Sequence, residues 1–213
     1  MNIITFLIDF VLHIDKHLAA FTASYGMLTY FILFVVIFCE TGLVVTPFLP
    51  GDSLIFAAAA LAATAGTLNI WLLCVIFVAA AVIGNIVNYF IGRALGDKIY
   101  EKDFRFIKRS SIDRTKKFFD RHGGKTIIIT RFMPIIRTFA PFVAGIGKMK
   151  YAKFLLYNLL GGLCWVALFA VLGYFFGGLP FVKDHFSVII IAIIVISLVP
   201  AVVMKLMPKK AEQ

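Results

Sequence analysis

Long apolar runs dominate the sequence and indicate membrane-spanning helices. Residues 70–92 and 154–176 are each 23 positions long and contain no aspartate, glutamate, lysine or arginine. Residues 187–204 form a third apolar run, and a fourth begins near residue 26. A helix needs roughly 20 mainly apolar residues to cross a bilayer. We therefore expect an all-α, polytopic membrane protein.

Composition agrees with this class. Hydrophobic residues make up 62% of the chain and charged residues only 15%, whereas soluble domains average about 45–50% and about 25%. The formal net charge of +10 lies mostly between the apolar runs, which is typical of a topology signal and not of a nucleic-acid surface. Because Cys39, Cys74 and Cys164 lie far apart in sequence, we predict no disulfide, no metal site and no cofactor.

The segment at residues 41–66 is apolar but interrupted, and it predicts a re-entrant hairpin. Pro47, Pro50 and Gly51 are the residues expected to form its turn. They leave arms of about a dozen residues, and at 1.5 Å per residue such an arm covers roughly 18 Å. This length is too short for a hydrocarbon core about 30 Å thick. The segment is therefore expected to enter and leave on the same side.

A second interrupted segment, residues 126–147, has the same character. Arg131 and Arg137 cost about 5–7 kcal/mol at mid-membrane, while the apolar side chains of the segment return roughly 3–6 kcal/mol. Prolines remove backbone donors and break helices, and irregular backbone survives at this depth only inside protein or beside water. We expect a second re-entrant hairpin, formed by Pro134, Pro141 and Gly145.

Basic residues set the expected topology. The loop at 93–125 carries 11 basic and 5 acidic residues, a net charge of +6, so the positive-inside rule places it in the cytoplasm together with the lysine-rich C-terminus. The two hairpins then enter from opposite faces, as in an inverted repeat of transporter-like half-helices. The full prediction is an interfacial amphipathic helix at 1–25, a first repeat at 26–92, the loop at 93–125, a second repeat at 126–206 with spans at 154–176 and 187–206, and a tail at 207–213. The side of the N-terminus is left open.

Four ionisable side chains lie in or beside the hairpins: Glu40, Asp52, Arg131 and Arg137. Charges at membrane depth are expensive and mark functional sites by default. If the hairpin tips meet, each arginine can pair with a carboxylate, or both can bind an external anion. Structural roles are the alternative: Asp52 as a helix cap, Glu40 as an interfacial or paired residue, and the arginines as partners of carbonyls left open by the prolines.

The arginines favour a phosphate ligand. A guanidinium binds phosphate through two parallel hydrogen bonds and stays protonated when buried, and a helix N-terminus in a broken segment adds backbone donors. Apolar walls indicate that the anion belongs to a lipid. The amides that are candidates for lining the cavity are Asn85, Asn88 and Asn158. The spacing of Ala80, Gly84, Asn88, Gly92 and Gly96 predicts close helix packing.

Three motifs carry a family resemblance: Glu40 with the following TPFLPGDS, GNIVNYFIGRALG at 84–96, and RFMPIIRTFAPFVAG at 131–145. Their order and spacing resemble the DedA family of VTT-domain membrane proteins. The resemblance implies a fold with opposed re-entrant hairpins in the bacterial inner membrane, linked to the proton motive force and to envelope homeostasis. It also implies that the family's acidic pair falls on Glu40 and Asp52, and its essential arginines on Arg131 and Arg137.

The same resemblance implies a substrate class. Some family members look like translocases of undecaprenyl phosphate, and eukaryotic relatives look like phospholipid scramblases. One position departs from the family pattern. Many relatives carry aspartate in a GDxxxY element where this chain has Asn85, so a third proton-carrying acid is not expected there.

We expect a proton-coupled transporter, or flippase, that moves a lipid phosphate and is not an enzyme. Arg131 and Arg137 are expected to bind the phosphate, while Glu40 and Asp52 compete for them until protonated. The expected partners are membrane lipids and protons, without nucleic acid, and homo-oligomer formation is left open. The alternatives are a proton antiporter for small cations or drugs, a lipid-phosphate phosphatase and a non-transporting assembly factor. No histidine lies near the arginines in sequence to support the phosphatase.

Overall fold

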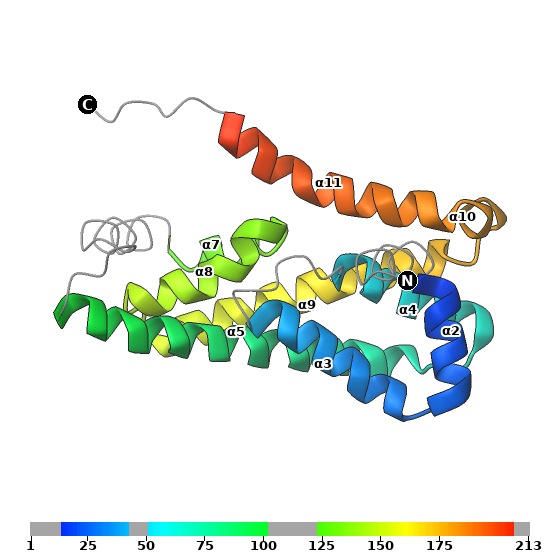
Figure 1. The fold of residues 1–213 in the computed structure, drawn as a ribbon, viewed down its shortest axis with the longest axis horizontal. Coiled ribbons are helices and arrows are strands. Elements are labelled where there is room, and N and C mark those ends of the chain that lie inside the picture. The colour runs from blue at the N-terminus through cyan, green and yellow to red at the C-terminus, as the bar shows by residue number, and fades with distance from the viewer. Residues whose placement is uncertain (1–13, 43–50, 102–122, 207–213) are drawn as a thin grey trace, which may run out of the picture.

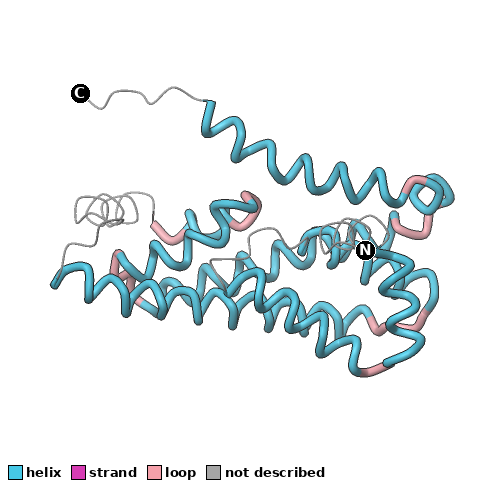
Figure 2. The backbone as a smooth tube through the Cα atoms, viewed as in Figure 1, coloured by secondary structure: helices cyan, strands magenta, loops and turns pink. Residues whose placement is uncertain are grey.

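The computed structural model describes residues 14–42, 51–101 and 123–206, and all regular elements in these ranges are helices (Figures 1 and 2). In chain order they are α2 (Ile14–Tyr25), α3 (Leu28–Gly42), α4 (Gly51–Ala65), α5 (Ile70–Glu101), α7 (Lys125–Thr130), α8 (Pro134–Ile146), α9 (Tyr151–Phe176), α10 (Pro180–Asp184) and α11 (Phe186–Leu206). The all-α prediction is confirmed. Residues 1–13 of the predicted N-terminal helix, most of the basic loop and the C-terminal tail lie outside the described residues.

Among the residues that the structure describes, two helices are long and apolar enough to cross a membrane. They cover Ile70–Gly96 in α5 and Tyr151–Phe176 in α9, with 27 and 26 residues, and they contain the two longest predicted spans. Helix α5 continues to Glu101, past the predicted boundary at residue 92. It continues because the sequence after Gly92 is rich in good helix formers and has no proline.

The first interrupted segment contains a short, deeply buried helix. Helix α4 has 15 residues, and every residue from 51 to 60 is buried. Such a helix spans about 22 Å, and an apolar helix without a polar face belongs in the interior of a bundle. Pro47 and Pro50, predicted to form the turn, lie outside the described residues.

The second interrupted segment forms two helices joined by a break. Helix α7 has 6 residues, and α8 begins at Pro134. A proline is tolerated at this position because the backbone N–H groups in the first turn of a helix have no acceptor within the helix. The predicted break at Pro134 is therefore confirmed. The prediction for Pro141 is wrong, because Pro141 lies inside α8 and the helix continues to Ile146. Gly145 lies in the last turn of α8, where its role is close packing and not a turn.

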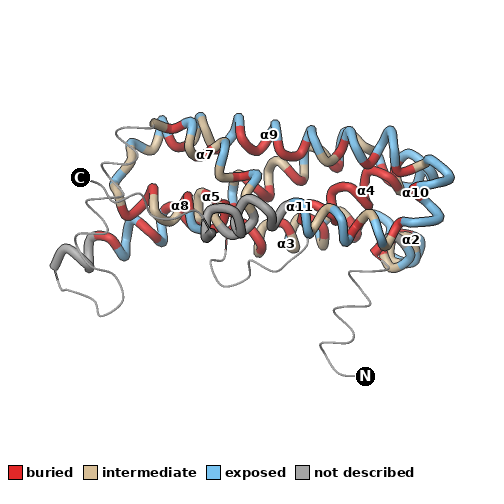
Figure 3. The backbone as a smooth tube through the Cα atoms, turned by 90° about the horizontal axis from the view of Figure 1, so that it is seen from above, coloured by how far each residue is buried: buried red, intermediate tan, exposed pale blue. Residues whose placement is uncertain are grey.

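Small residues on α5 bring its neighbours close, as the spacing predicted. A Cβ added at Gly84 would fall 2.1 Å from Thr41 Oγ1 of α3, and one at Gly92 would fall 2.1 Å from the Phe142 carbonyl of α8. Helices α3 and α8 therefore pack on α5, while α4 packs against α9. Figure 3 shows the buried turns of α9 facing inward and its exposed turns on the outside.

The outer surface of the bundle is apolar. Large exposed hydrophobic side chains occur on α3, α5, α9 and α11, among them Phe31, Trp71, Phe175 and Ile196, which are 63%, 79%, 68% and 68% exposed. Exposed apolar patches of this extent mark a surface that contacts lipid or protein. The two long apolar helices and this surface are features of a membrane protein.

Candidate anion-binding site

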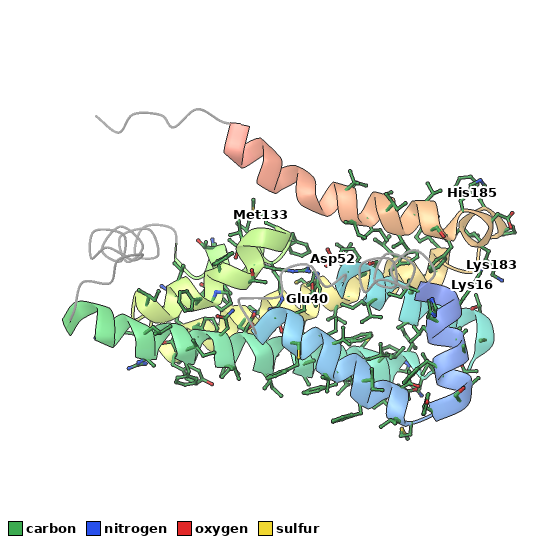
Figure 4. All side chains as sticks on the ribbon, viewed as in Figure 1. Lys16, Glu40, Asp52, Met133, Lys183 and His185 are labelled. Atoms are coloured by element: carbon green, nitrogen blue, oxygen red, sulfur yellow. The ribbon has the colours of Figure 1, made fainter. Side chains whose placement is uncertain are left out.

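Four buried charges meet where helix ends converge. Glu40 lies in the last turn of α3, Asp52 in the first turn of α4, Arg131 directly after α7, and Arg137 in the first turn of α8. Each of the four is at most 8% exposed. Glu40 and Asp52 lie near the middle of the long axis of the molecule (Figure 4). The sequence-predicted charges therefore form one site.

Arg137 binds both carboxylates. Its Nη2 donates to Glu40 Oε1 and its Nη1 donates to Asp52 Oδ1 at 2.5 Å. The sequence left open whether each arginine pairs with a carboxylate or both bind an external anion, and the structure shows a third arrangement, in which both carboxylates bind Arg137. The reason is that Arg137, near the start of α8, faces the ends of both α3 and α4, which bring the two acids together.

The other oxygen of Glu40 lies against the start of α4. A Cβ added at Gly51 would fall 1.9 Å from Glu40 Oε2, so this position accepts only glycine unless the carboxylate moves. Glu40 is fully buried and does not reach an interface. Asp52 also bonds two side chains outside its own helix, so capping of α4 is not its only role.

Arg131 is held by a neutral partner. Its Nη1 donates to the backbone oxygen of Asn158 at 2.8 Å and to Asn158 Oδ1 at 3.0 Å. Gly161 and Gly162 of α9 lie beside this side chain, and a Cβ added at Gly162 would be in ordinary van der Waals contact with Nη1, at 3.5 Å. Within the described part of the chain, Arg131 Nη2 is buried without a hydrogen-bond partner.

The three predicted amides have different roles. Asn85 donates to Asn158 Oδ1 at 2.9 Å, and Asn158 donates to the Val82 carbonyl at 3.0 Å. Asn88 donates to the carbonyls of Thr138 at 2.6 Å and Thr41 at 3.3 Å, so it joins α5 to α8 and α3. Of the three, Asn85 lines a small cavity between these side chains. The other two donate hydrogen bonds to the backbone of neighbouring helices.

Trp165 connects the two arginines. Its ring centroid lies 5.1 Å from Arg137 Cζ and 5.7 Å from Arg131 Cζ, within cation–π range, and its Nε1 donates to Asp52 Oδ1 at 2.8 Å. Sequence reasoning does not find this residue, because a tryptophan in an apolar span resembles a core residue. The available signal is that a buried indole N–H needs a hydrogen-bond partner.

A small cavity lies between these side chains. Its volume is about 10 Å³, and it is lined by Thr41, Asn85, Arg131, Arg137 and Trp165. This volume has room for about one water molecule. No cluster of three or more histidine, cysteine, aspartate or glutamate side chains suited to a metal occurs in the part of the chain that the structure describes. The donors that line the cavity are cationic or neutral, which suits an anion.

Comparison with known proteins places the chain in a family. The model of the VTT domain matches residues 49–175. Protein DedA of Escherichia coli is 52% identical over 99% of this chain and 97% of its own. The chain belongs to the DedA family of VTT-domain proteins. Two further relatives from Escherichia coli, inner membrane proteins YghB and YqjA, are 35% and 33% identical over 83% and 84% of this chain and 78% and 81% of theirs.

The family match covers most of the site. Asp52, Asn85, Arg131, Arg137 and Trp165 all lie within the VTT domain, while Glu40 precedes it. No solved structure matches the chain.

Proposed function

We propose that this DedA-family chain is a transporter, linked to the proton motive force, that moves a lipid phosphate such as undecaprenyl phosphate or a phospholipid across the inner membrane. The relatives named as inner membrane proteins support that location. We propose further that residues 41–66 and 126–147 are re-entrant hairpins of an inverted repeat, with the basic loop and C-terminus in the cytoplasm. The short α4 and the break between α7 and α8 support this arrangement.

One observation carries the proposal: two buried guanidinium groups line the same cavity inside an apolar bundle. Arginine binds phosphate oxygens in bidentate fashion and keeps its charge at depth. Buried ion pairs contribute little net stability, so stability alone is a weak reason for four buried charges. An anion with an apolar tail fits both the donors and the surface that surrounds them.

Proton binding is coupled to phosphate binding through the two carboxylates. Glu40 and Asp52 both form ion pairs with Arg137, and the cavity has room for about one water molecule. A phosphate therefore reaches Arg137 only after these ion pairs separate. Protonation removes the negative charge that holds Arg137. Proton entry on one side of the membrane would then favour phosphate capture there, and deprotonation on the other side would displace it.

Two alternatives are less well supported. A cation site would need available carboxylates, whereas Glu40 and Asp52 both bind Arg137. A phosphatase needs an activated nucleophile, and the hydroxyl that lines the cavity, Thr41 Oγ1, donates to the Ile37 carbonyl at 2.8 Å. We therefore propose transport without covalent chemistry.

The experiment is a lipid-crossing assay in vesicles that contain purified protein. Labelled polyprenyl phosphate is placed in one leaflet, a pH difference is imposed, and the label reaching the other leaflet is measured. We expect Arg131→Ala and Arg137→Lys each to lose most of the crossing rate, because lysine keeps the charge but not the bidentate geometry. Arg93→Lys is the matched control, since Arg93 is exposed on α5. Crossing that ignores both site variants and the gradient would contradict the proposal, as would release of phosphate from the lipid.

A further inference from the structure

The two arginines of the cavity differ in their partners. Arg137 donates to two carboxylates, so two negative charges face its single positive charge. Arg131 donates only to the neutral Asn158, and its Nη2 is buried without a partner among the described residues. Arg131 is 3% exposed and lines the cavity. A buried donor without an acceptor is unfavourable, and an anion at this position would satisfy it.

We infer that the arginines have unequal roles: Arg131 receives the phosphate, while Arg137 is withheld from it by its ion pairs with Glu40 and Asp52. We call the cluster of Arg137, Glu40 and Asp52 the latch, which is closed while these ion pairs are formed. The inference rests on the proposed function and assigns its steps to residues. The ligand class is a phosphate monoester on an apolar chain. Arg131 Nη2 supplies the first donor, and Arg137 becomes a second donor when the latch opens.

The latch holds three helices together. Glu40 lies in the last turn of α3, Asp52 in the first turn of α4 and Arg137 in α8. One guanidinium therefore joins two residues that are 85 and 97 positions away from it along the chain. Neutralising the carboxylates releases α8 from the other two helices at this point. Arg131 keeps its bonds to Asn158 on α9, because none of these bonds involves the latch. The receiving group therefore stays in place while the latch opens.

Asn85 is a neutral neighbour of Arg131 and does not balance its positive charge. Asn85 Nδ2 and Arg131 Nη1 both donate to Asn158 Oδ1, at 2.9 and 3.0 Å, so these two nitrogens are at most 5.9 Å apart, the sum of the two distances. A carboxylate at position 85 would compete directly with a phosphate for Arg131. The neutral amide keeps the charge of Arg131 available to the ligand.

The test measures binding of farnesyl phosphate to the full chain in detergent micelles by calorimetry. Three variants are compared with wild type: Arg131→Gln, Asn85→Asp, and a neutral latch that combines Glu40→Gln with Asp52→Asn and keeps Arg137. We expect the first two to weaken binding about tenfold or more, the usual effect of losing a charge-assisted hydrogen bond. The neutral latch should bind more tightly than wild type, because the released Arg137 becomes a second donor to the phosphate. Asn69→Asp is the matched control, since Asn69 caps α5 outside the cavity.

The outcomes separate this inference from the proposed function. Wild type that does not bind farnesyl phosphate would overturn both. Wild type that binds, with a neutral latch as weak as Arg131→Gln, would overturn the unequal roles alone. Inorganic phosphate that binds as tightly as farnesyl phosphate would support Arg131 as the receptor and overturn a lipid substrate. If Asn85→Asp does not fold, as judged by gel filtration, the comparison of Arg131→Gln with the neutral latch decides.

Discussion

Trp165 is the residue that most closely links the charges of the site. Its indole N–H binds Asp52, and its ring lies within cation–π range of Arg131 and Arg137. The side chain is 1% exposed, so both interactions occur away from water. Removing the N–H therefore leaves a buried carboxylate with one donor fewer, and removing the ring also uncovers the guanidinium groups. Trp165 is a positioning residue for the ion cluster.

At the residue scale we predict that Trp165→Phe lowers the free energy of unfolding by about 1.5–3 kcal/mol, the range for a hydrogen bond to a charged group. Trp165→Leu should lose about 0.5–2 kcal/mol more, because the cation–π contacts disappear. The measurement is unfolding in mixed detergent micelles. Trp71→Phe is the matched control, because Trp71 is 79% exposed, and it should change stability by less than about 0.5 kcal/mol. Equal effects at the two tryptophans would contradict the role given to Trp165.

Sequence reasoning singles out the four charged residues but does not decide their pairing. Glu40, Asp52, Arg131 and Arg137 stand out because ionisable side chains are rare in apolar segments. Which acid meets which arginine depends on the direction of α8 relative to α3 and α4, and sequence spacing carries no such information. For the same reason, the division of the asparagines into one that lines the cavity and two that hold helices emerges only from the structure.

At the scale of elements, α5 organises the site through its small residues. Gly84 allows α3 to approach, and Gly92 and Gly96 allow α8 to approach. These contacts bring the ends of α3 and α8, and with them Glu40 and Arg137, to the same place. In a bilayer, helix association depends on such close packing, because lipid is as apolar as the side chains it would replace.

We predict that Gly92→Ala destabilises the protein by about 1–3 kcal/mol, the range for overpacking. The added Cβ would fall 2.1 Å from the backbone oxygen of Phe142, so α5 and α8 must separate. The measurement is again unfolding in micelles. Gly178→Ala is the control, because its nearest neighbour would be 3.4 Å away. An unchanged or higher stability for Gly92→Ala, as helix propensity alone would give, would contradict this packing.

The elements show where local sequence rules hold and where they fail. The long helices follow directly from the apolar runs, and Pro134 begins a helix as its chemistry favours. Pro141 fails as a predictor of a break, because a proline removes one backbone hydrogen bond but the remaining bonds and the packing on α5 keep α8 continuous. Tertiary contacts thus override a local signal.

At the scale of the whole molecule, residues distant in sequence form one buried ion cluster. Helices α3, α4, α8 and α9 each contribute a side chain to it. The sequence indicates this convergence only through the predicted topology, in which two broken segments are expected to enter from opposite faces and to end near each other. The depth of those segments in the bilayer stays a prediction.

The central claim is that Arg137 and Asp52 interact directly in the folded protein, and a double-mutant cycle tests it. Asp52→Asn, Arg137→Gln and the double variant are unfolded in mixed micelles, and the coupling energy is calculated from the three changes. We predict a coupling of at least about 1 kcal/mol, and a coupling below about 0.5 kcal/mol for Asp52→Asn combined with Arg93→Gln, since residues without contact behave additively. Additive effects of Asp52→Asn and Arg137→Gln would contradict the account.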